Sequence, residues 1–271
     1  DTQNTLSGGC INSAFRLSDG EQEWFVKTNG AARLAMFEAE AAGLNAIADT
    51  QTIGAPRALC TGSSGDTAFI VMRHLHLGNG NTLGWREAGR QLAALHRCSA
   101  DAYGWDRGNT IGATPQHNDW QADWVTFWRD QRLAFQLAEA ARNGYRGRLQ
   151  SLGEKLLARF PVLIDHAPSP SLLHGDLWGG NLSFTHSGEA VVYDPAVYYG
   201  DREADLAMTE LFGGFSADFY ASYRDAWPLD AGYRVRKTLY NLYHVLNHLN
   251  LFGGGYGGQA QGMMERLLAE C

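Results

Sequence analysis

Apolar and polar residues alternate in two short segments near the start of the chain. These segments cover residues 11–17 and 22–28, and the turn-forming residues Ser-Asp-Gly-Glu separate them. Alternation with a period of two places apolar side chains on one face of a strand, so the pattern predicts a β-hairpin. In residues 33–48 the apolar positions follow a helical period instead, and Ala and Glu are good helix formers. The start of the chain therefore predicts a hairpin followed by a helix.

Two more strands are predicted at residues 57–62 and 68–74, before a connector rich in Gly and Asn at 75–81. Beyond residue 79 the period is mainly helical, in the segments 85–98, 118–143, 148–160, 201–212, 233–252 and 263–270. Short apolar runs at 171–177, 181–184 and 190–194 interrupt this pattern and predict small strands and loops. We predict an α+β fold, with a small β-rich lobe that contains one helix over residues 1–78 and a larger, mainly helical lobe over 79–271.

Composition excludes several classes of protein. The chain has no run of 18 apolar residues, and its first residues lack a basic-then-apolar signal pattern, so we expect a cytoplasmic protein that does not bind a membrane. A net charge of -7 argues against a nucleic-acid partner, which normally requires a basic surface. The four cysteines lie far apart without a CxxC pair, so neither a cysteine zinc site nor a disulfide framework is predicted.

The segment His-Gly-Asp-Leu-Trp-Gly-Gly-Asn at residues 174–181 carries the residue types that phosphoryl transfer needs. Such a reaction uses a carboxylate to accept a hydroxyl proton and oxygen ligands for magnesium. Asp176 is the candidate base, and Asn181 can turn back over two glycines to offer its amide oxygen to the metal. Asp194 follows Asn181 by thirteen residues, at the end of an apolar strand, and is the second candidate metal ligand.

The predicted N-terminal lobe supplies a candidate cation for the phosphates of ATP. Lys27 ends the apolar segment Trp-Phe-Val-Lys, and Glu40 follows it by thirteen residues, a spacing that permits an ion pair. Glu38 is the alternative partner, and an exposed lysine at a strand end is the alternative interpretation of Lys27. Gly8 and Gly9 can let backbone N–H groups approach a phosphate before the first predicted strand.

Several longer motifs resemble the fructosamine kinase (ketosamine-3-kinase) family, in the aminoglycoside-phosphotransferase branch of the protein-kinase-like fold. They include LLHGDLWGGN, DP…YYGDREADLA, FGGF, GNTIGATPQHNDW and LNHLNLFGGGYG, and together they extend over most of the chain. The resemblance implies a two-lobed enzyme that uses ATP and Mg²⁺ to phosphorylate the 3-hydroxyl of ketosamines such as ribulosyl-lysine or fructosyl-lysine. The substrate is then free or part of a glycated protein, and the phosphorylated product decomposes, which amounts to deglycation and protein repair.

The resemblance also assigns roles to residues. It makes Asp176 the catalytic base, Asn181 and Asp194 the magnesium ligands, and Lys27 with Glu40 the phosphate-binding pair. It places Gly8 and Gly9 in the nucleotide loop, and the backbone of the hinge residues Arg73, His74 and Leu75 against adenine. The alternatives are another small-molecule kinase, of the aminoglycoside or choline kinase type, and a pseudokinase that binds without turnover.

Trp178 lies two residues after the candidate base and offers a flat aromatic face to a sugar or a protonated amine, so we assign it to the substrate. His248 either reaches a sugar hydroxyl or lies in the core. His174 is expected to be a structural residue of the loop.

Other polar and aromatic residues have two interpretations. Asp201, Glu203 and Asp205 either line an acidic wall for an amine or favour a helix N-terminus. Trp120, Trp124 and Trp128 recur every four residues, which predicts one buried face of a helix, and the alternative is a platform for the substrate. Cys10 is either inert or oxidisable, and in the second case it would link a monomer into a redox-dependent dimer.

Overall fold

The fold is described from a computed structural model, which covers residues 2–6 and 12–271 in its backbone and residues 12–271 in its side chains. The chain divides into two compact units. The first unit contains residues 1–95, 180–196 and 216–226, and the second contains 96–179, 197–215 and 227–271. These units do not coincide with the predicted lobes of 1–78 and 79–271, because later segments return to the first unit. The lobe boundary stays a prediction.

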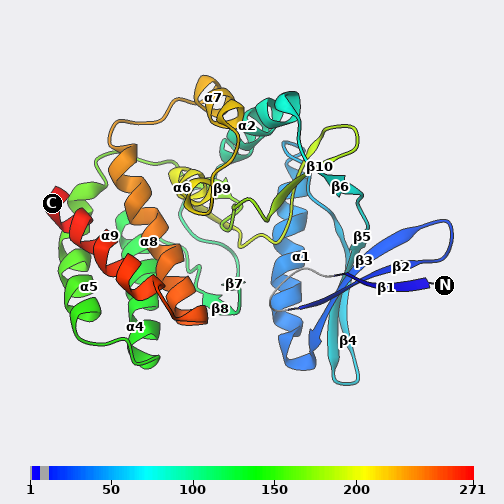
Figure 1. The fold of residues 1–271 in the computed structure, drawn as a ribbon, viewed down its shortest axis with the longest axis horizontal. Coiled ribbons are helices and arrows are strands. Elements are labelled where there is room, and N and C mark those ends of the chain that lie inside the picture. The colour runs from blue at the N-terminus through cyan, green and yellow to red at the C-terminus, as the bar shows by residue number, and fades with distance from the viewer. Residues whose placement is uncertain (1, 7–11) are drawn as a thin grey trace. The chain divides into compact units, whose positions relative to one another are not determined.

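A five-stranded antiparallel sheet forms the centre of the first unit (Figure 1). Its strands are β1 (Thr2–Leu6), β2 (Ser13–Ser18), β3 (Glu23–Gly30), β5 (Thr67–Arg73) and β4 (Ala58–Ser64), in that spatial order. The predicted hairpin is confirmed, since Ser13 to Ser18 pair with Thr28 to Glu23. After a 3₁₀ turn (Ala31–Arg33), the predicted helix is α1 (Leu34–Asp49), which packs against β4 and β5.

The interface between α1 and the sheet is the core of this unit. Phe37 and Leu44 of α1 are completely buried and meet Ala68, Ile70 and Met72 of β5. Burying one such side chain contributes about 1.5–3 kcal/mol. The apolar face of α1 and the apolar face of the sheet, both predicted from the sequence, therefore pack against each other.

The rest of the first unit consists of short strands and two helices. The predicted connector contains β6 (Leu77–Gly78), which pairs with β10 (Leu182–Thr185), and β10 pairs with β11 (Ala190–Val192). α2 (Thr82–His96) lies in this unit up to Leu95, and α7 (Ala217–Ala226) packs on it. A Cβ at Gly89 would come within 2.4 Å of the Phe219 carbonyl oxygen, so only glycine permits this approach of the two helices.

The second unit is mainly helical, as predicted (Figure 1). Its helices are α3 (Trp124–Trp128), α4 (Phe135–Arg142), α5 (Arg148–Arg159), α6 (Glu203–Leu211), α8 (Tyr233–Phe252) and α9 (Tyr256–Glu270), with a π-helical turn (Arg129–Ala134) and a 3₁₀ turn (Phe160–Leu163). Helix α8 has the predicted bounds, and eleven of its residues are buried, because α4, α6 and α9 all pack against it. Two short strand pairs complete the unit, β7 (Asn109–Ile111) with β8 (Thr114–Gln116) and β9 (Ser171–Leu173) with β12 (Tyr198–Gly200).

The predicted helical face of three tryptophans is wrong at its first member. The Asp123 side chain accepts a hydrogen bond of 2.7 Å from the Thr126 N–H, and this N-cap starts the helix at Trp124. Trp120 therefore lies before the helix, with 42% of its surface exposed. Trp124 and Trp128 do lie in the core, where both contact the ring of Tyr240.

Candidate active site

A buried cluster of charges lies in the first unit, between the sheet and α1. Lys27 occupies the middle of β3, and its Nζ lies 2.6 Å from Oε1 of Glu40 on α1. The same ammonium group donates a hydrogen bond to the carboxylate of Asp194. Side-chain exposure is 10% for Lys27 and 11% for Glu40, whereas it is 45% for Asp194. The predicted ion pair is thus present, and Glu38, the alternative partner, is exposed.

The electrostatics of this cluster leave one negative charge in excess. Burial opposes the charged form of Lys27, but Glu40 and Asp194 outweigh it and raise the pKa of the ammonium group above its ordinary value. The pKa of Glu40 is raised by its burial and by Asp194, although Lys27 opposes the rise. With one cation facing two carboxylates, the cluster attracts a further cation at its exposed member, Asp194.

Asp194 and Asn181 are held together by the chain around them. The Tyr193 N–H donates to the Asn181 carbonyl oxygen at 3.1 Å, and Asn181 Nδ2 makes a long hydrogen bond of 3.5 Å to the Asp194 carbonyl oxygen. Asp194 has a φ of +57°, a left-handed conformation that costs a residue other than glycine about 1–2 kcal/mol. A carboxylate and an amide oxygen are ligands that Mg²⁺ prefers, so the chemistry of this donor pair fits a magnesium ion.

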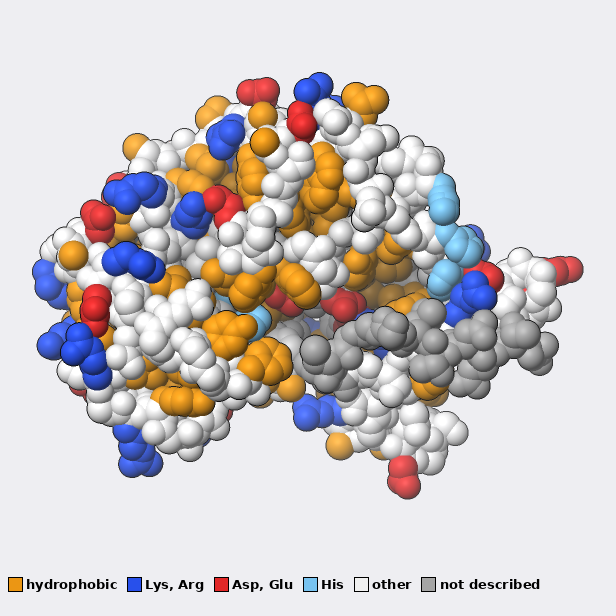
Figure 2. All heavy atoms as spheres, in the orientation of Figure 1, with side chains coloured by type: hydrophobic (Ala, Val, Ile, Leu, Met, Phe, Trp, Pro, Cys, Tyr) orange, Lys and Arg blue, Asp and Glu red, His pale blue; other side chains and the backbone are white. Residues whose placement is uncertain are grey.

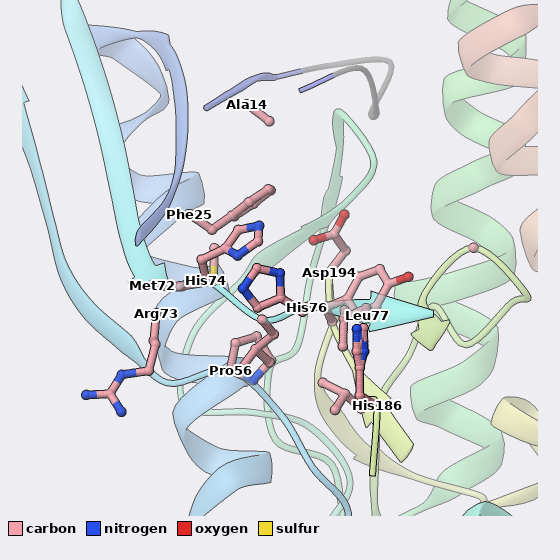
Figure 3. A pocket seen from close by; sticks show the side chains of 14 residues that line it. Ala14, Phe25, Pro56, Met72, Arg73, His74, His76, Leu77, His186 and Asp194 are labelled. Carbon is pink, nitrogen blue, oxygen red and sulfur yellow. The ribbon is translucent and has the colours of Figure 1, made fainter. Parts of the chain in front are cut away.

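A cavity of about 700 Å³ opens beside this cluster (Figure 3). Apolar side chains, among them Ala14, Phe25 and Met72, form part of its wall, and Asp194 also lines it. The predicted hinge residues Arg73, His74 and Leu75 lie along the same cavity. Figure 3 shows the Arg73 side chain pointing away from the other lining residues, so its backbone is the part that faces the cavity. An apolar slot next to charged groups suits a flat, largely apolar ring that carries a charged tail.

The second unit holds the segment that contains Asp176, in a loop after β9. The buried carboxylate of Asp205 accepts hydrogen bonds from the backbone N–H groups of His174 and Gly175, at 2.7 and 2.8 Å. Its Oδ2 also lies 3.1 Å from Nε2 of His96. The Asp176 N–H donates to Nδ1 of His174 at 3.3 Å, so His174 is a structural residue of the loop, as expected.

The conformation of this loop depends on two particular residues. Gly175 has a φ of +83°, which favours glycine at that position. Burial would raise the pKa of Asp205, but the hydrogen bond and charge of His96 and the loop contacts outweigh it and lower the pKa below its ordinary value. His96 is a partner that sequence reasoning missed. The sequence feature that could have pointed to it is its position in the last turn of an amphipathic helix.

Trp178, the predicted substrate residue, lies in the second unit with 40% of its surface exposed. Its ring meets Phe212 edge-on, with 6.3 Å between the ring centroids. Phe212 in turn contacts His248, and the two centroids are 4.8 Å apart. Nδ1 of His248 lies 2.8 Å from the His244 carbonyl oxygen, and burial lowers the pKa of the imidazole, so the ring is neutral at pH 7. The described side chains thus place His248 in a half-buried aromatic cluster.

The acidic wall considered for Asp201, Glu203 and Asp205 is not present. All three side chains are buried, with 1%, 0% and 1% of their surface exposed, and Glu203 and Asp205 lie in the first turn of α6, as the alternative interpretation has it. Arg236 binds both carboxylate oxygens of Glu203, at 2.7 and 2.9 Å, and Tyr240 donates a hydrogen bond of 2.5 Å to Asp201. These acids stabilise the interior instead of facing a substrate. Gly8, Gly9 and Cys10 lie outside the described residues.

The fold by itself identifies the class of protein. A crystal structure of an aminoglycoside phosphotransferase superposes on the whole chain with a TM-score of 0.68, at 15% sequence identity and covering 94% of that protein. The chain therefore has the protein-kinase-like fold of these phosphotransferases, with an antiparallel sheet and one helix in its N-terminal part and a mainly helical C-terminal part. Among the described residues, no helix is long and apolar enough to cross a membrane.

Similarity in sequence then identifies the family. The family model for fructosamine kinase matches residues 1–270. A candidate ketoamine kinase of Synechocystis sp. is 50% identical over 98% of this chain and 90% of its own length. A chloroplastic protein-ribulosamine 3-kinase of Oryza sativa subsp. japonica is 41% identical, over 98% of this chain and 78% of its own. The crystal structure of a candidate fructosamine-3-kinase from Haemophilus somnus has a TM-score of 0.91 and 31% identity, over 99% of this chain and 91% of that one. The chain belongs to the fructosamine kinase family and is a phosphotransferase.

Proposed function

We propose that the protein transfers the γ-phosphoryl group of ATP to the 3-hydroxyl of a ketosamine, a ribulosyl- or fructosyl-lysine that is free or part of a glycated protein. The observation that carries this proposal is the Lys27, Glu40 and Asp194 cluster beside the apolar cavity of the first unit. The similarity to proteins described as ketoamine and ribulosamine kinases supports the choice of acceptor. Cytoplasmic location stays a prediction, as does the decomposition of the product that would release the amine.

The cavity suits the two chemically different ends of a nucleotide. Adenine would lie between the apolar side chains and the backbone of residues 73–75, as the family resemblance implies. Lys27 would bind the phosphates, because Glu40 holds its ammonium group at 2.6 Å and keeps it charged. The family resemblance assigns Gly8 and Gly9, which lie outside the described residues, to the same nucleotide site.

Asn181 and Asp194 would hold a magnesium ion, since their oxygens are the hard ligands that this ion selects. When bound, magnesium neutralises charge on the transferring phosphoryl group. Lys27 has a related role, because it shares the Asp194 carboxylate and so limits the negative charge near the phosphates.

Asp176 would accept the proton of the acceptor hydroxyl as the hydroxyl oxygen attacks phosphorus. Asp205 holds the loop of Asp176 through the two backbone N–H groups that precede it. Trp178 would contact the protonated amine or the sugar ring of the acceptor, a cation–π contact that contributes about 0.5–2 kcal/mol. General base catalysis contributes about 10²- to 10⁴-fold to a rate.

The test measures ATP consumption with ribulosyl-lysine and fructosyl-lysine in parallel, with and without magnesium. Asp176→Asn is the matched variant, because it keeps the size of the side chain and removes the base. We expect magnesium-dependent turnover that falls by about 10²- to 10⁴-fold in the variant, while ADP binding to the variant stays normal in a calorimetric titration. Near-normal turnover by Asp176→Asn would refute the role of Asp176, and turnover of aminoglycosides or choline alone would refute the acceptor.

A further inference from the structure

A second cluster of polar side chains lies in the first unit, at the rim of the cavity. Glu23 is the first residue of β3, His74 follows the end of β5, and His76 precedes β6. His186 follows β10, next to the pairing of Thr185 with Leu77, and so comes to lie beside His76. Figure 3 shows the three imidazole rings near one another, and Figure 2 shows a run of histidine side chains on the visible face.

The spacing of these atoms is that of ligands around one metal ion. Oε2 of Glu23 lies 3.2 Å from Nδ1 of His74 and 3.1 Å from Nε2 of His76. One ligand atom from each of the three residues falls within 4.8 Å of the others. Zinc binds nitrogen and oxygen ligands at about 2.0–2.2 Å in a tetrahedron, which separates neighbouring ligand atoms by about 3.3–3.5 Å. Small movements of the side chains would therefore complete the geometry.

Two of these atoms have polar neighbours only within the cluster. Oε2 of Glu23 and Nδ1 of His74 are both buried, and apart from the contact of 3.2 Å between them and that of Oε2 with His76 neither has a polar partner among the described residues. Imidazole nitrogens and a carboxylate oxygen are all ligands that zinc accepts.

The surrounding contacts hold the ligands in place before any ion arrives. The other carboxylate oxygen of Glu23 faces the guanidinium group of Arg16 at 3.4 Å, which orients the carboxylate. The His74 N–H donates to the Glu23 carbonyl oxygen at 3.0 Å, so the backbone fixes these two residues relative to each other. The exposed ring of His186 lies parallel to His76, with 6.3 Å between the centroids, where a rotation of the side chain can bring it to the ion.

We propose that Glu23, His74 and His76 form a binding site for a divalent transition-metal ion of the Zn²⁺ type, with His186 as the fourth ligand. Imidazole nitrogens select zinc, nickel and copper over magnesium, which prefers oxygen. This site is therefore distinct from the proposed magnesium ligands Asn181 and Asp194. It does not depend on the proposed kinase activity, since it is formed by the protein alone.

The test titrates Zn²⁺ into the nucleotide-free protein, in the presence of excess Mg²⁺, and follows binding by calorimetry. We expect one ion per chain in the wild type. His76→Ala removes a ligand whose side chain is 64% exposed, so the variant should fold normally and bind Zn²⁺ more than about 100-fold more weakly. His186→Ala should weaken binding by about 10-fold, because water replaces one ligand.

Two control variants separate this site from other zinc ligands. His117→Ala removes an exposed histidine of the second unit, and Cys60→Ser removes an exposed thiol of the first. Both should bind Zn²⁺ as the wild type does. Equal affinity of His76→Ala and wild type, loss of binding in Cys60→Ser, or no stoichiometric binding by the wild type would each overturn the proposal. Circular dichroism confirms that each variant is folded.

Discussion

Each unit contains a cluster in which a buried basic side chain meets a buried glutamate and an exposed aspartate, and the two clusters differ in where that aspartate lies. In the first unit Lys27 pairs with Glu40 and with Asp194, whose side chain is 45% exposed at the cavity. In the second unit Arg236 binds Glu203 with both partners buried, at 0% and 1% side-chain exposure, and it also pairs with Asp165, whose side chain is 56% exposed. Asp194 lines the cavity, where a ligand can reach it, whereas Asp165 is not among the residues that line that cavity.

This difference indicates how to separate a site from a scaffold when both contain the same residue types. Mutation of one partner in a buried ion pair mainly lowers the stability of the folded protein, because the remaining charge is left uncompensated. A cluster whose accessible carboxylate lines a cavity can act on a ligand. We therefore expect mutations in the second-unit cluster to lower stability and those in the first-unit cluster to lower activity.

The largest expected effect is on stability, in the variant Arg236→Met. It leaves Glu203 buried without its cation, so we expect the free energy of unfolding to fall by about 3–5 kcal/mol. Chemical denaturation measures this change. Arg234→Met is the matched control, because Arg234 lies in the same helix with an 83% exposed side chain, and its effect should stay within about 0.5 kcal/mol. If Arg236→Met lost turnover while keeping wild-type stability, the distinction between the clusters would be wrong.

The next effect is on catalysis, in Lys27→Met. Removing a cation that stabilises transferring phosphate should lower kcat by about 10²- to 10³-fold. Because the pKa of Lys27 is raised in the folded protein, its contribution to stability is present below its unfolded pKa and is lost as pH rises through the folded value. Neutral pH is therefore suitable for the kinetic assay. Lys237→Met, which removes a partly exposed pair with Glu210, is the control and should keep wild-type kcat.

A smaller effect is expected in Asp205→Asn. The amide keeps one acceptor but turns an NH₂ group toward N–H donors of the loop, which should cost about 1.5–3 kcal/mol. The folded pKa of Asp205 is lowered, so its stabilisation is present above the unfolded pKa and is lost as pH falls through the folded value. Unfolding measured from pH 7 to pH 2 should show a weaker acid dependence in the variant than in the wild type. Asp101→Asn, at an exposed position, should reproduce the wild-type curve, and so should Asp205→Asn if the carboxylate does not anchor the loop.

Local patterns predicted much of the fold. The hairpin, α1 and the bounds of α8 followed from periodicity, because each buries one continuous apolar face. Helix α7 was missed, since its large buried apolar side chains are confined to two aromatic residues, Phe219 and Tyr223. The start of α3 was misplaced because the cap at Asp123, not the tryptophan repeat, decides where the helix begins.

In the candidate site, contacts between segments that are close in sequence could be predicted, whereas contacts between distant segments could not. The ion pair of Lys27 and Glu40 could be predicted from one strand followed by one helix. The contact of Asp205 with His96 joins residues 109 positions apart. The periodicity of a single sequence carries no information on contacts at such a separation. The same limit concealed the cluster of Glu23 with His74, which forms only because β3 and β5 are neighbours in the sheet.

The smallest expected effect links the proposed metal site to the cavity. His74 belongs to both, so an ion that draws its imidazole toward Glu23 changes the wall against which adenine would lie. We expect Zn²⁺ to weaken the binding of adenosine by about fivefold, and adenosine to weaken the binding of Zn²⁺ by the same factor, because such coupling is reciprocal. Adenosine is the suitable probe, since it lacks the phosphates that would chelate zinc. The coupling should vanish in His76→Ala; because His76 also lines the cavity, the adenosine affinity of this variant with Zn²⁺ is compared with its own affinity without Zn²⁺. Unchanged adenosine affinity at saturating Zn²⁺ would separate the two sites, and zinc would then bind the first unit without regulating its nucleotide.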